Sequence, residues 1–304
     1  MMLKRSGHGT LTAGPARPIA LSRLARLLVE RQHAAFGRGD GRVRSLTRVG
    51  VWVLLVLAAA NGLFLYFAPG LADSDYAWSI KPPVDAAFIG ASFLAGTLAT
   101  GLVLTTATRW RTFSTLPPAL WVLASTLLAA TIIHQDRFRW DYAPTWVWAL
   151  VYGGVPLAVP FLVARQRRVA EGEPDADPAL RTLRALSGIV GALLVVGAAA
   201  LFAAPAELGE HWVWPLTPLL ARTVAAWYAL FGTMLLSCAI ALRRPAEAII
   251  AYATLGTWSL LVLALPFLHP DDVSGGGLWI PLMLVLLGLS GYALRIALRD
   301  RERL

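Results

Sequence analysis

Long apolar segments separated by short polar ones run through most of the chain. Eight segments of roughly 19–26 mainly apolar residues are each long enough to cross the ~30 Å hydrocarbon core of a bilayer as a helix. Helices are the expected spanning element because they satisfy their own backbone hydrogen bonds in lipid. The segments lie at about 49–68, 84–107, 117–134, 144–164, 185–204, 218–242, 246–268 and 278–297. This pattern predicts an all-α membrane protein with eight transmembrane helices.

The composition agrees with this prediction. Hydrophobic residues make up 57% of the 304 residues and charged residues 15%, whereas a soluble domain carries about 25% charged residues. The single cysteine, Cys238, lies inside the sixth apolar segment, which excludes an internal disulfide and a cysteine-based metal site. The sequence contains no phosphate-binding loop or other catalytic motif, so it assigns no catalytic residue, no metal and no cofactor.

The distribution of Lys and Arg predicts how the helices are oriented. If the N-terminus is cytoplasmic, 23 of the 27 Lys and Arg residues fall in cytoplasmic segments, and only Lys81, Arg137 and Arg139 fall in external loops. Cytoplasmic loops carry such an excess of cations, so we expect both termini in the cytoplasm. Topology and anionic lipids at the inner leaflet then account for the net charge of +9, and no nucleic-acid partner is expected.

Polar segments divide the chain into five parts. Residues 1–46 form a basic cytoplasmic segment, disordered at first and followed by an amphipathic helix at 21–37. This helix either lies on the inner leaflet or is solvated. Residues 47–164 form a first membrane half with spans 1–4, and residues 185–298 a second with spans 5–8. A cytoplasmic linker at 165–184 joins them, and residues 299–304 form a cytoplasmic tail.

The two halves resemble each other in sequence. At an offset of 136 residues Trp78 aligns with Trp214 and Pro82 with Pro218, and at an offset of 135 His134 aligns with His269. Matches of such rare residues at nearly one offset indicate an internal duplication. Because each half has four spans, the repeats are parallel and related by a pseudo-two-fold axis along the membrane normal, an arrangement found among transporters. A shared site is then expected between the halves.

Two charged residues open corresponding helices on the external side. Asp85 lies at the start of the second span, and Arg222 lies just after Thr217 and Pro218 in the sixth. The helix dipole favours a carboxylate in a first turn, whereas an arginine there needs water or a partner at membrane depth. Three interpretations of Arg222 stay open: snorkelling to the interface, an ion pair with Asp85 across the pseudo-two-fold axis, or an anion-binding or gating role.

A His-x-Asp motif ends the third and the seventh spans. It consists of His134 with Asp136 and of His269 with Asp271. Imidazole and carboxylate groups suit divalent metals, and histidines that titrate near neutral pH can couple protons to transport. Both residue types are also natural in the turn after a helix, so ordinary turn chemistry is the third interpretation.

Helix breakers interrupt the fourth span, and tryptophans flank several spans. Gly153, Gly154, Pro156 and Pro160 lie in the motif VYGGVPLAVP. Proline removes an intrahelical hydrogen bond and kinks the helix, which is typical of a packing kink and, less often, of a transporter site. Seven tryptophans map near the external boundary, where an aromatic belt is expected: Trp78, Trp140, Trp146, Trp148, Trp212, Trp214 and Trp279.

The segments AWSIKPPVDAAFIGASFLAG (77–96), HQDRF (134–138) and WVWPLTPLLAR (212–222) resemble a group of bacterial multi-pass membrane proteins with no assigned activity. The resemblance implies an eight-span protein of the bacterial inner membrane and supplies no functional residue. From the sequence we expect a small-solute transporter or permease with an outward-facing polar site between the repeats. The alternative is a membrane scaffold or sensor that uses the basic cytoplasmic segments, and a membrane-embedded enzyme is third.

Overall fold

A computed structural model describes residues 43, 45–107, 110–166, 177–274 and 277–303. Within these residues the chain is helical and contains no strand. Eight helices are long and apolar enough to cross a membrane, which confirms the predicted number of spans and their approximate places in the sequence. The amphipathic helix expected at 21–37 lies outside the described residues.

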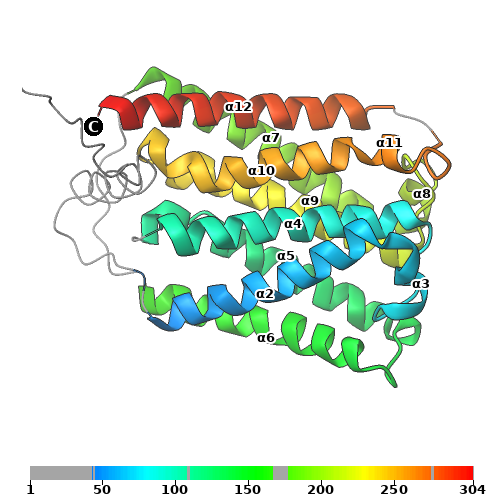
Figure 1. The fold of residues 1–304 in the computed structure, drawn as a ribbon. Coiled ribbons are helices and arrows are strands. Elements are labelled where there is room, and N and C mark those ends of the chain that lie inside the picture. Colours follow the sequence, from blue (N-terminus) through cyan, green and yellow to red (C-terminus); the bar gives the residue numbers. More distant parts are fainter. Residues whose placement is uncertain (1–42, 44, 108–109, 167–176, 275–276, 304) are drawn as a thin grey trace, which may run out of the picture. The chain divides into compact units, whose positions relative to one another are not determined.

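The long helices of the described chain run side by side, with short helical turns in the connections (Figure 1). Seven of them are α2 (Ser45–Phe67), α4 (Pro83–Thr106), α5 (Leu116–Ile133), α6 (Ala143–Gln166), α7 (Pro178–Ala203), α9 (Pro218–Ala241) and α12 (Trp279–Arg303). The seventh span in chain order is a composite of η4 (Pro245–Ala248), α10 (Ile249–Leu263) and α11 (Leu265–Leu268). The remaining short elements are η1 (Pro69–Leu71), α3 (Ala72–Asp75), η2 (Trp110–Phe113), η3 (Gln135–Arg137) and α8 (Pro205–Gly209).

Proline and a capping side chain set the starts of the second and sixth spans. Pro83 and Pro218 are the first residues of α4 and α9, where the missing N–H is not needed and the backbone angle φ is already helical. The Thr217 hydroxyl accepts a hydrogen bond from the Leu220 N–H at 3.4 Å. The Thr-Pro pair therefore starts α9 as its sequence predicts.

The same capping chemistry makes the fifth span longer than its apolar segment. The Asp177 carboxylate accepts a hydrogen bond from the Ala179 N–H at 2.8 Å, and Pro178 is the first helical residue. Residues 178–184, which the sequence pattern places in the linker, are therefore helical. Hydropathy alone does not predict this helical segment, because its arginines interrupt the apolar run. The helix starts earlier, at the Asp177 cap.

The connections between the long helices gather at two ends. One end, which we call the tryptophan-rich end, contains the connecting residues 68–82, 134–142, 204–217, 269–274 and 277–278, with the short helices α3, α8 and α11 (Figure 1). The connecting residues 110–115 and 242–244 lie at the opposite end. Which end faces the cytoplasm stays a prediction of the charge pattern.

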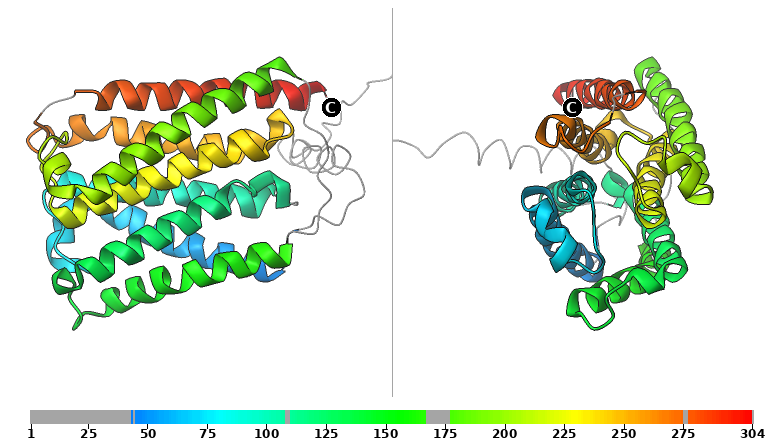
Figure 2. Two further views of the ribbon diagram at one scale, coloured as in Figure 1. Left: turned by 180° about the vertical axis from the view of Figure 1, so that it is seen from behind. Right: turned by 90° about the vertical axis from the view of Figure 1, so that its right-hand side faces the viewer.

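Helix pairing follows one scheme in the first four long helices and in the second four. Helix α2 packs along α4 and α5 along α6, while α7 packs along α9 and α10 along α12. The two groups meet where α5 packs against α9 and where α10 packs against α4 (Figure 2). The spans that contain α4, α9 and α10 are the most deeply buried of the eight. Each group thus contributes its second and third spans to the contact with the other.

Glycines permit the closest helix contacts. A Cβ atom on Gly90 of α4 would lie 2.4 Å from the backbone nitrogen of Tyr66 in α2. A Cβ atom on Gly191 of α7 would lie 2.9 Å from the carbonyl oxygen of Gly232 in α9. Both distances are shorter than atoms tolerate, so a larger residue at either place would push its two helices apart.

The predicted helix breakers of the fourth span lie inside α6. Pro160 has no N–H group, which leaves the carbonyl oxygen of Pro156 without its usual partner four residues later. The Trp121 Nε1–H of α5 donates to this oxygen at 3.1 Å. The prolines are therefore part of the packing between α5 and α6, because a neighbouring side chain satisfies the carbonyl that Pro160 frees.

Candidate functional site

Matching backbone hydrogen bonds organise the connections at the tryptophan-rich end. The Arg139 N–H donates to the Ala77 carbonyl at 3.0 Å, and the Ser274 N–H donates to the Val213 carbonyl at 2.9 Å. The second bond lies 135–136 residues after the first. In the same way the N–H of His134 and that of His269 each close a helix by donating to the carbonyl four residues earlier. In each group of four helices, the two connections at this end are therefore hydrogen-bonded to each other at matching sequence positions.

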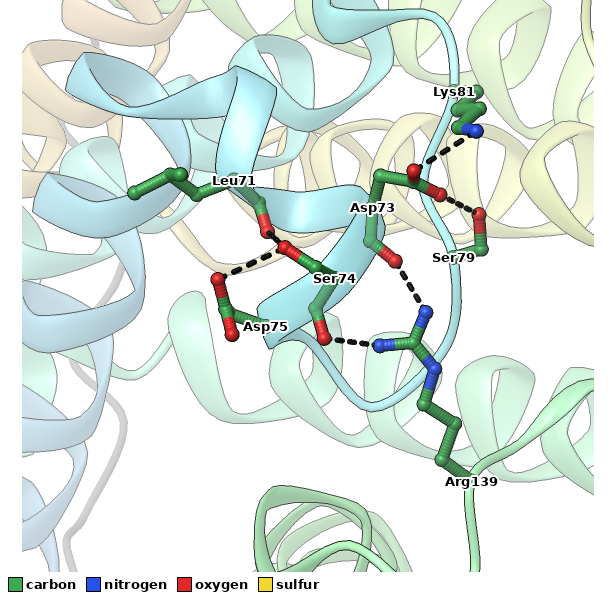
Figure 3. A network of polar contacts seen from close by, with 7 residues as sticks. All are labelled: Leu71, Asp73, Ser74, Asp75, Ser79, Lys81 and Arg139. Carbon is green, nitrogen blue, oxygen red and sulfur yellow. Dashed lines mark hydrogen bonds and ion pairs between the residues drawn. The ribbon is translucent and has the colours of Figure 1, made fainter.

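A polar network fixes the connection that precedes α4 (Figure 3). The Asp73 carboxylate receives the Ser79 hydroxyl and pairs with the Lys81 ammonium at 2.8 Å. The Lys81 contact, followed by the Ser79 hydrogen bond, lowers the pKa of Asp73 below its ordinary value. The Arg139 guanidinium donates to the backbone carbonyls of Asp73 and Ser74. The network therefore ties residues 73–81 to the connection between α5 and α6.

Asp85 is the most deeply buried charged residue among the predicted site residues. Only 1% of its surface is exposed. Its Oδ1 accepts a hydrogen bond from the Trp214 Nε1–H at 2.7 Å, so the start of α4 is joined to the segment that precedes α9. Its Oδ2 has no hydrogen-bond partner among the described residues. A buried carboxylate oxygen without a donor is costly, which marks this position as unusual.

The connection after α11 brings a second carboxylate to the start of α4. The Asp272 Oδ2 accepts a hydrogen bond from the Val84 N–H at 3.2 Å, and the His269 Nδ1 lies 3.8 Å from the same oxygen. Asp272 therefore caps α4 from another part of the chain. The predicted Asp271 is exposed, so in the second His-x-Asp motif it is the following residue that enters the site.

Arg222 contacts His134 and not Asp85. Its Nη1 lies 2.6 Å from the His134 Nε2. A guanidinium can only donate, so His134 accepts at Nε2 and carries its proton on Nδ1. The Arg222 guanidinium also lies over the Phe202 ring, 5.5 Å from its centroid. The ion pair considered between Asp85 and Arg222 is not formed in the described part of the chain, because each has a different partner.

The environment of His134 favours the neutral imidazole. Partial burial and then the Arg222 cation hold its pKa below the ordinary value of 6.5, while Asp136 acts in the opposite direction. Asp136 itself is exposed and pairs with the neighbouring Arg137 at 3.2 Å. The two His-x-Asp motifs thus face different partners, a cation for His134 and a carboxylate for His269.

A cavity at the tryptophan-rich end is bounded by segments from both groups of four helices. It has a volume of about 550 Å³ and is lined by residues 69–70, 73, 80–83 and 215–217. Pro83 lies two positions before Asp85, and Pro215 directly follows Trp214. Residues that line the cavity are therefore close in sequence to both partners of the Asp85–Trp214 hydrogen bond.

Several tryptophans assigned to an aromatic belt lie instead in the protein interior. Trp78 and Trp214 are 2% and 0% exposed, and Trp148 and Trp279 are also buried. The ring of Trp78 packs against Tyr76, Phe138 and Trp148, and that of Trp214 packs against Phe88, Trp212 and Trp279. Trp140 and Trp146 are exposed. Position along the helix does not reveal which face a ring occupies, so the belt prediction is wrong for the buried four.

The polar residues form two separate clusters. Arg222 and His134 make one, and Asp85 with Asp272 and His269 makes the other; within the described residues no hydrogen bond or ion pair joins them. Within the described residues there is no group of three or more His, Cys, Asp or Glu side chains that could hold a metal ion. The sequence pattern indicates Trp214 only as a repeat and belt residue and not as the donor to Asp85. It does not indicate Asp272, which directly follows the selected Asp271.

No known protein family, no curated protein and no solved structure matches this chain. The resemblance to bacterial multi-pass membrane proteins therefore stays a prediction. The fold and the two clusters are the basis for the functional proposal below.

Proposed function

We propose that this protein is a small-solute transporter built from two fused four-helix halves, with its binding site between the halves at the tryptophan-rich end. Eight helices that are long and apolar enough to cross a membrane support the polytopic part of this proposal. The proposed orientation follows the positive-inside pattern, which directs the tryptophan-rich end outward and both termini to the cytoplasm. The proposed membrane is the bacterial inner membrane.

The duplication is supported by how the helices pair. The first half pairs its spans as α2–α4 and α5–α6, and the second as α7–α9 and α10–α12. The contacts between halves are reciprocal, since the third span of each packs against the second span of the other. The matching backbone bonds at Ala77 and Val213 occur at the sequence offset that the tryptophans and histidines predict. A pseudo-two-fold axis would then pass between α4 and α9.

The observation that carries the transport proposal is the buried carboxyl of Asp85 at the contact between the halves. Ionisable residues at membrane depth are costly and commonly mark ion or substrate pathways. Among the described residues one oxygen of Asp85 has no donor, and Asp272 supplies a second carboxylate at the same helix start. Two carboxylates favour a cationic solute or a proton over an anion.

The neighbouring cavity provides the space in which a solute would bind beside Asp85. Its lining comes from residues 69–83 of the first half and 215–217 of the second. A relative movement of the halves would displace Trp214 from Asp85, because the two residues belong to different halves. Such alternating access around a fixed site is the usual mode of transporters built from repeats.

The test measures cation transport by the full chain in proteoliposomes. Currents on a solid-supported membrane are recorded after addition of Na⁺, K⁺, methylammonium, choline or putrescine. We expect at least one of these cations to give a current above protein-free vesicles, and we expect Asp85→Asn to reduce that current by roughly tenfold or more. Asp271→Asn is the matched control, since Asp271 is an exposed carboxylate at the same end, and its current should equal that of the unmodified chain.

Two results would overturn the proposal. One is a current no larger than that of protein-free vesicles for all five cations. The other is an equal current for the unmodified chain and Asp85→Asn. The first result would favour the scaffold or sensor, whose basic segments at 1–46 and 165–184 lie largely outside the described residues. The second would remove Asp85 from the transport site.

A further inference from the structure

A second cavity lies in the first half, toward the end opposite the tryptophan-rich one. It has a volume of about 430 Å³ and lies between α2, α4, α5 and α6, with η2 at one side. Its lining, which consists of described residues only, contains no charged side chain, and Thr47 and Thr100 are the only hydroxyl-bearing residues in it. The cavity is therefore suited to an apolar ligand, and its volume is within the roughly 300–1,000 Å³ of ligand sites.

In the second half, residues that align with the cavity lining are buried and packed against each other. There the Ser187 hydroxyl of α7 is hydrogen-bonded to the Tyr252 hydroxyl of α10, and both residues are buried. Under the proposed duplication their counterparts are Val51 and Pro117, 136 and 135 positions earlier, and both line the cavity. Under the duplication, Val51 and Pro117 stand in place of a hydrogen-bonded serine and tyrosine, and this difference leaves the cavity open. This comparison between halves rests on the proposed function, whereas the cavity itself does not.

A glycine replaces leucine on the fourth helix of the first half. Gly154 of α6 lines the cavity, and a Cβ atom placed on it would meet no atom within 4 Å. The residue 135 positions later is Leu289 of α12, which is 7% exposed and so fills the equivalent space. Neighbouring Gly153 corresponds to another glycine, Gly288, and does not line the cavity.

The cavity opens sideways, between α2 and α6. Val53 of α2 and Leu150 of α6 both line it, yet they are 53% and 74% exposed. In a membrane an apolar opening on the side of a helical bundle faces lipid chains. An apolar cavity of this volume is unfavourable when empty, because its lining atoms lose their packing partners.

A cation lies near one end of the cavity. Arg48 is exposed, and its guanidinium donates to the Leu104 carbonyl at 3.4 Å. Thr47 and Val103, the neighbours of these two residues in the chain, line the cavity. The guanidinium is therefore held at the end of the cavity between α2 and α4, where it can pair with a phosphate.

We propose that this cavity is a binding site for one phospholipid, which inserts an acyl chain between α2 and α6 and pairs its phosphate with Arg48. The apolar lining selects the chain, and the lateral opening admits it from the bilayer. In the second half, the buried side chains of Tyr252 and Leu289 stand at the positions that align with Pro117 and Gly154 of the cavity lining.

Photo-crosslinking with a defined lipid tests this directly. The full chain is reconstituted in vesicles of phosphatidylglycerol that carries a diazirine in one acyl chain, and cross-linked residues are mapped by mass spectrometry. We expect cross-links at cavity residues such as Val151 and Leu57 to exceed by about tenfold those at Leu193 and Val196 of α7, which are 67% exposed and report ordinary bilayer contact.

A matched pair of variants separates cavity binding from general lipid contact. Gly154→Leu should lower the cavity cross-links by about tenfold and leave those at Leu193 unchanged, whereas Gly153→Leu should leave both unchanged. Arg48→Gln should lower the amount of phosphatidylglycerol that copurifies in mild detergent.

The lipid proposal has its own contradicting results, which do not depend on solute transport. Cavity cross-links in the unmodified chain no more frequent than those at Leu193 would overturn it, and this measurement needs no variant. Equal cavity labelling of Gly154→Leu and the unmodified chain would also overturn it. So would copurification of a non-lipid apolar molecule in place of a phospholipid.

Discussion

The first four long helices enclose an apolar cavity, whereas in the second four the aligned positions Ser187, Tyr252 and Leu289 are buried. In the second half, a Ser187–Tyr252 hydrogen bond links α7 to α10, and the Tyr292 hydroxyl of α12 donates to the Ala179 carbonyl of α7 at 3.4 Å. In the first half, the positions equivalent to Ser187 and Tyr252 are apolar and line the cavity. Two groups of helices that pair in the same way can therefore differ in how their interiors are packed.

The halves also differ at the tryptophan-rich end. Trp214 of the second half donates to Asp85 of the first. Its counterpart Trp78 is equally buried, but its Nε1 has no partner in the described part of the chain. The residue 136 positions after Asp85 is Ala221, which offers no acceptor. A carboxyl at one position and an alanine at the other accounts for the fact that only one of the two tryptophans is bonded, so the two positions can be compared directly.

The difference in interior packing predicts the largest effect on stability. Leu255 of α10 is fully buried, while its counterpart Leu120 of α5 lines the existing cavity. Leu255→Ala creates a new void and should lower the free energy of unfolding by about 2–5 kcal/mol, whereas Leu120→Ala only enlarges a void and should cost less than about 2 kcal/mol. Unfolding by sodium dodecyl sulfate, followed by circular dichroism, measures both. Equal costs would show that the two interiors are packed alike.

The unequal tryptophans predict an intermediate effect. Trp214→Phe and Trp78→Phe remove the same atoms from two buried sites, but only the first leaves the Asp85 carboxyl without a donor. Trp214→Phe should therefore lower the free energy of unfolding by about 1.5–3 kcal/mol more than Trp78→Phe does. The same unfolding assay gives the difference. If Asp85→Asn erased none of it, the hydrogen bond would not be its cause.

The smallest effect concerns the contact between His134 and Arg222, and it depends on pH. Because the pKa of His134 is lowered in the folded protein, the unfolded chain takes up the proton at higher pH. The contribution of this site to stability is therefore complete above about pH 6.5 and falls as the pH drops toward the folded pKa. Arg137 also disfavours the protonated ring, and Asp136 favours it.

The magnitude should stay within about 1 kcal/mol, because the site is partly exposed and is screened by solvent. Thermal unfolding in detergent between pH 7 and pH 5 measures it. His134→Gln keeps an acceptor for Arg222 without a titrating ring, so this variant should lose that part of the pH dependence. An unchanged profile in His134→Gln would assign the dependence to other groups.

The helices could be predicted from the sequence because length and hydropathy alone decide which segments span a bilayer. The prediction fell short at Pro178, where a capping carboxylate extends α7 past its apolar segment. It also failed for Trp78 and Trp214, whose burial depends on helix rotation and on contacts between distant segments. Asp272 could not be distinguished from Asp271, because only the folded connection turns one of them toward α4.

The bond between Asp85 and Trp214 joins positions 129 residues apart, which has a consequence for synthesis. Chains are made from the N-terminus, and their early parts begin to fold first. When α4 enters the membrane, the indole that will bind its carboxyl has not yet been translated, and neither has Asp272, which caps the same helix. These two polar contacts of α4 can therefore form only after Trp214 and Asp272 have been synthesised. A ribosome that stalled before residue 214 would leave α4 in lipid with an unbonded carboxyl and an uncapped start.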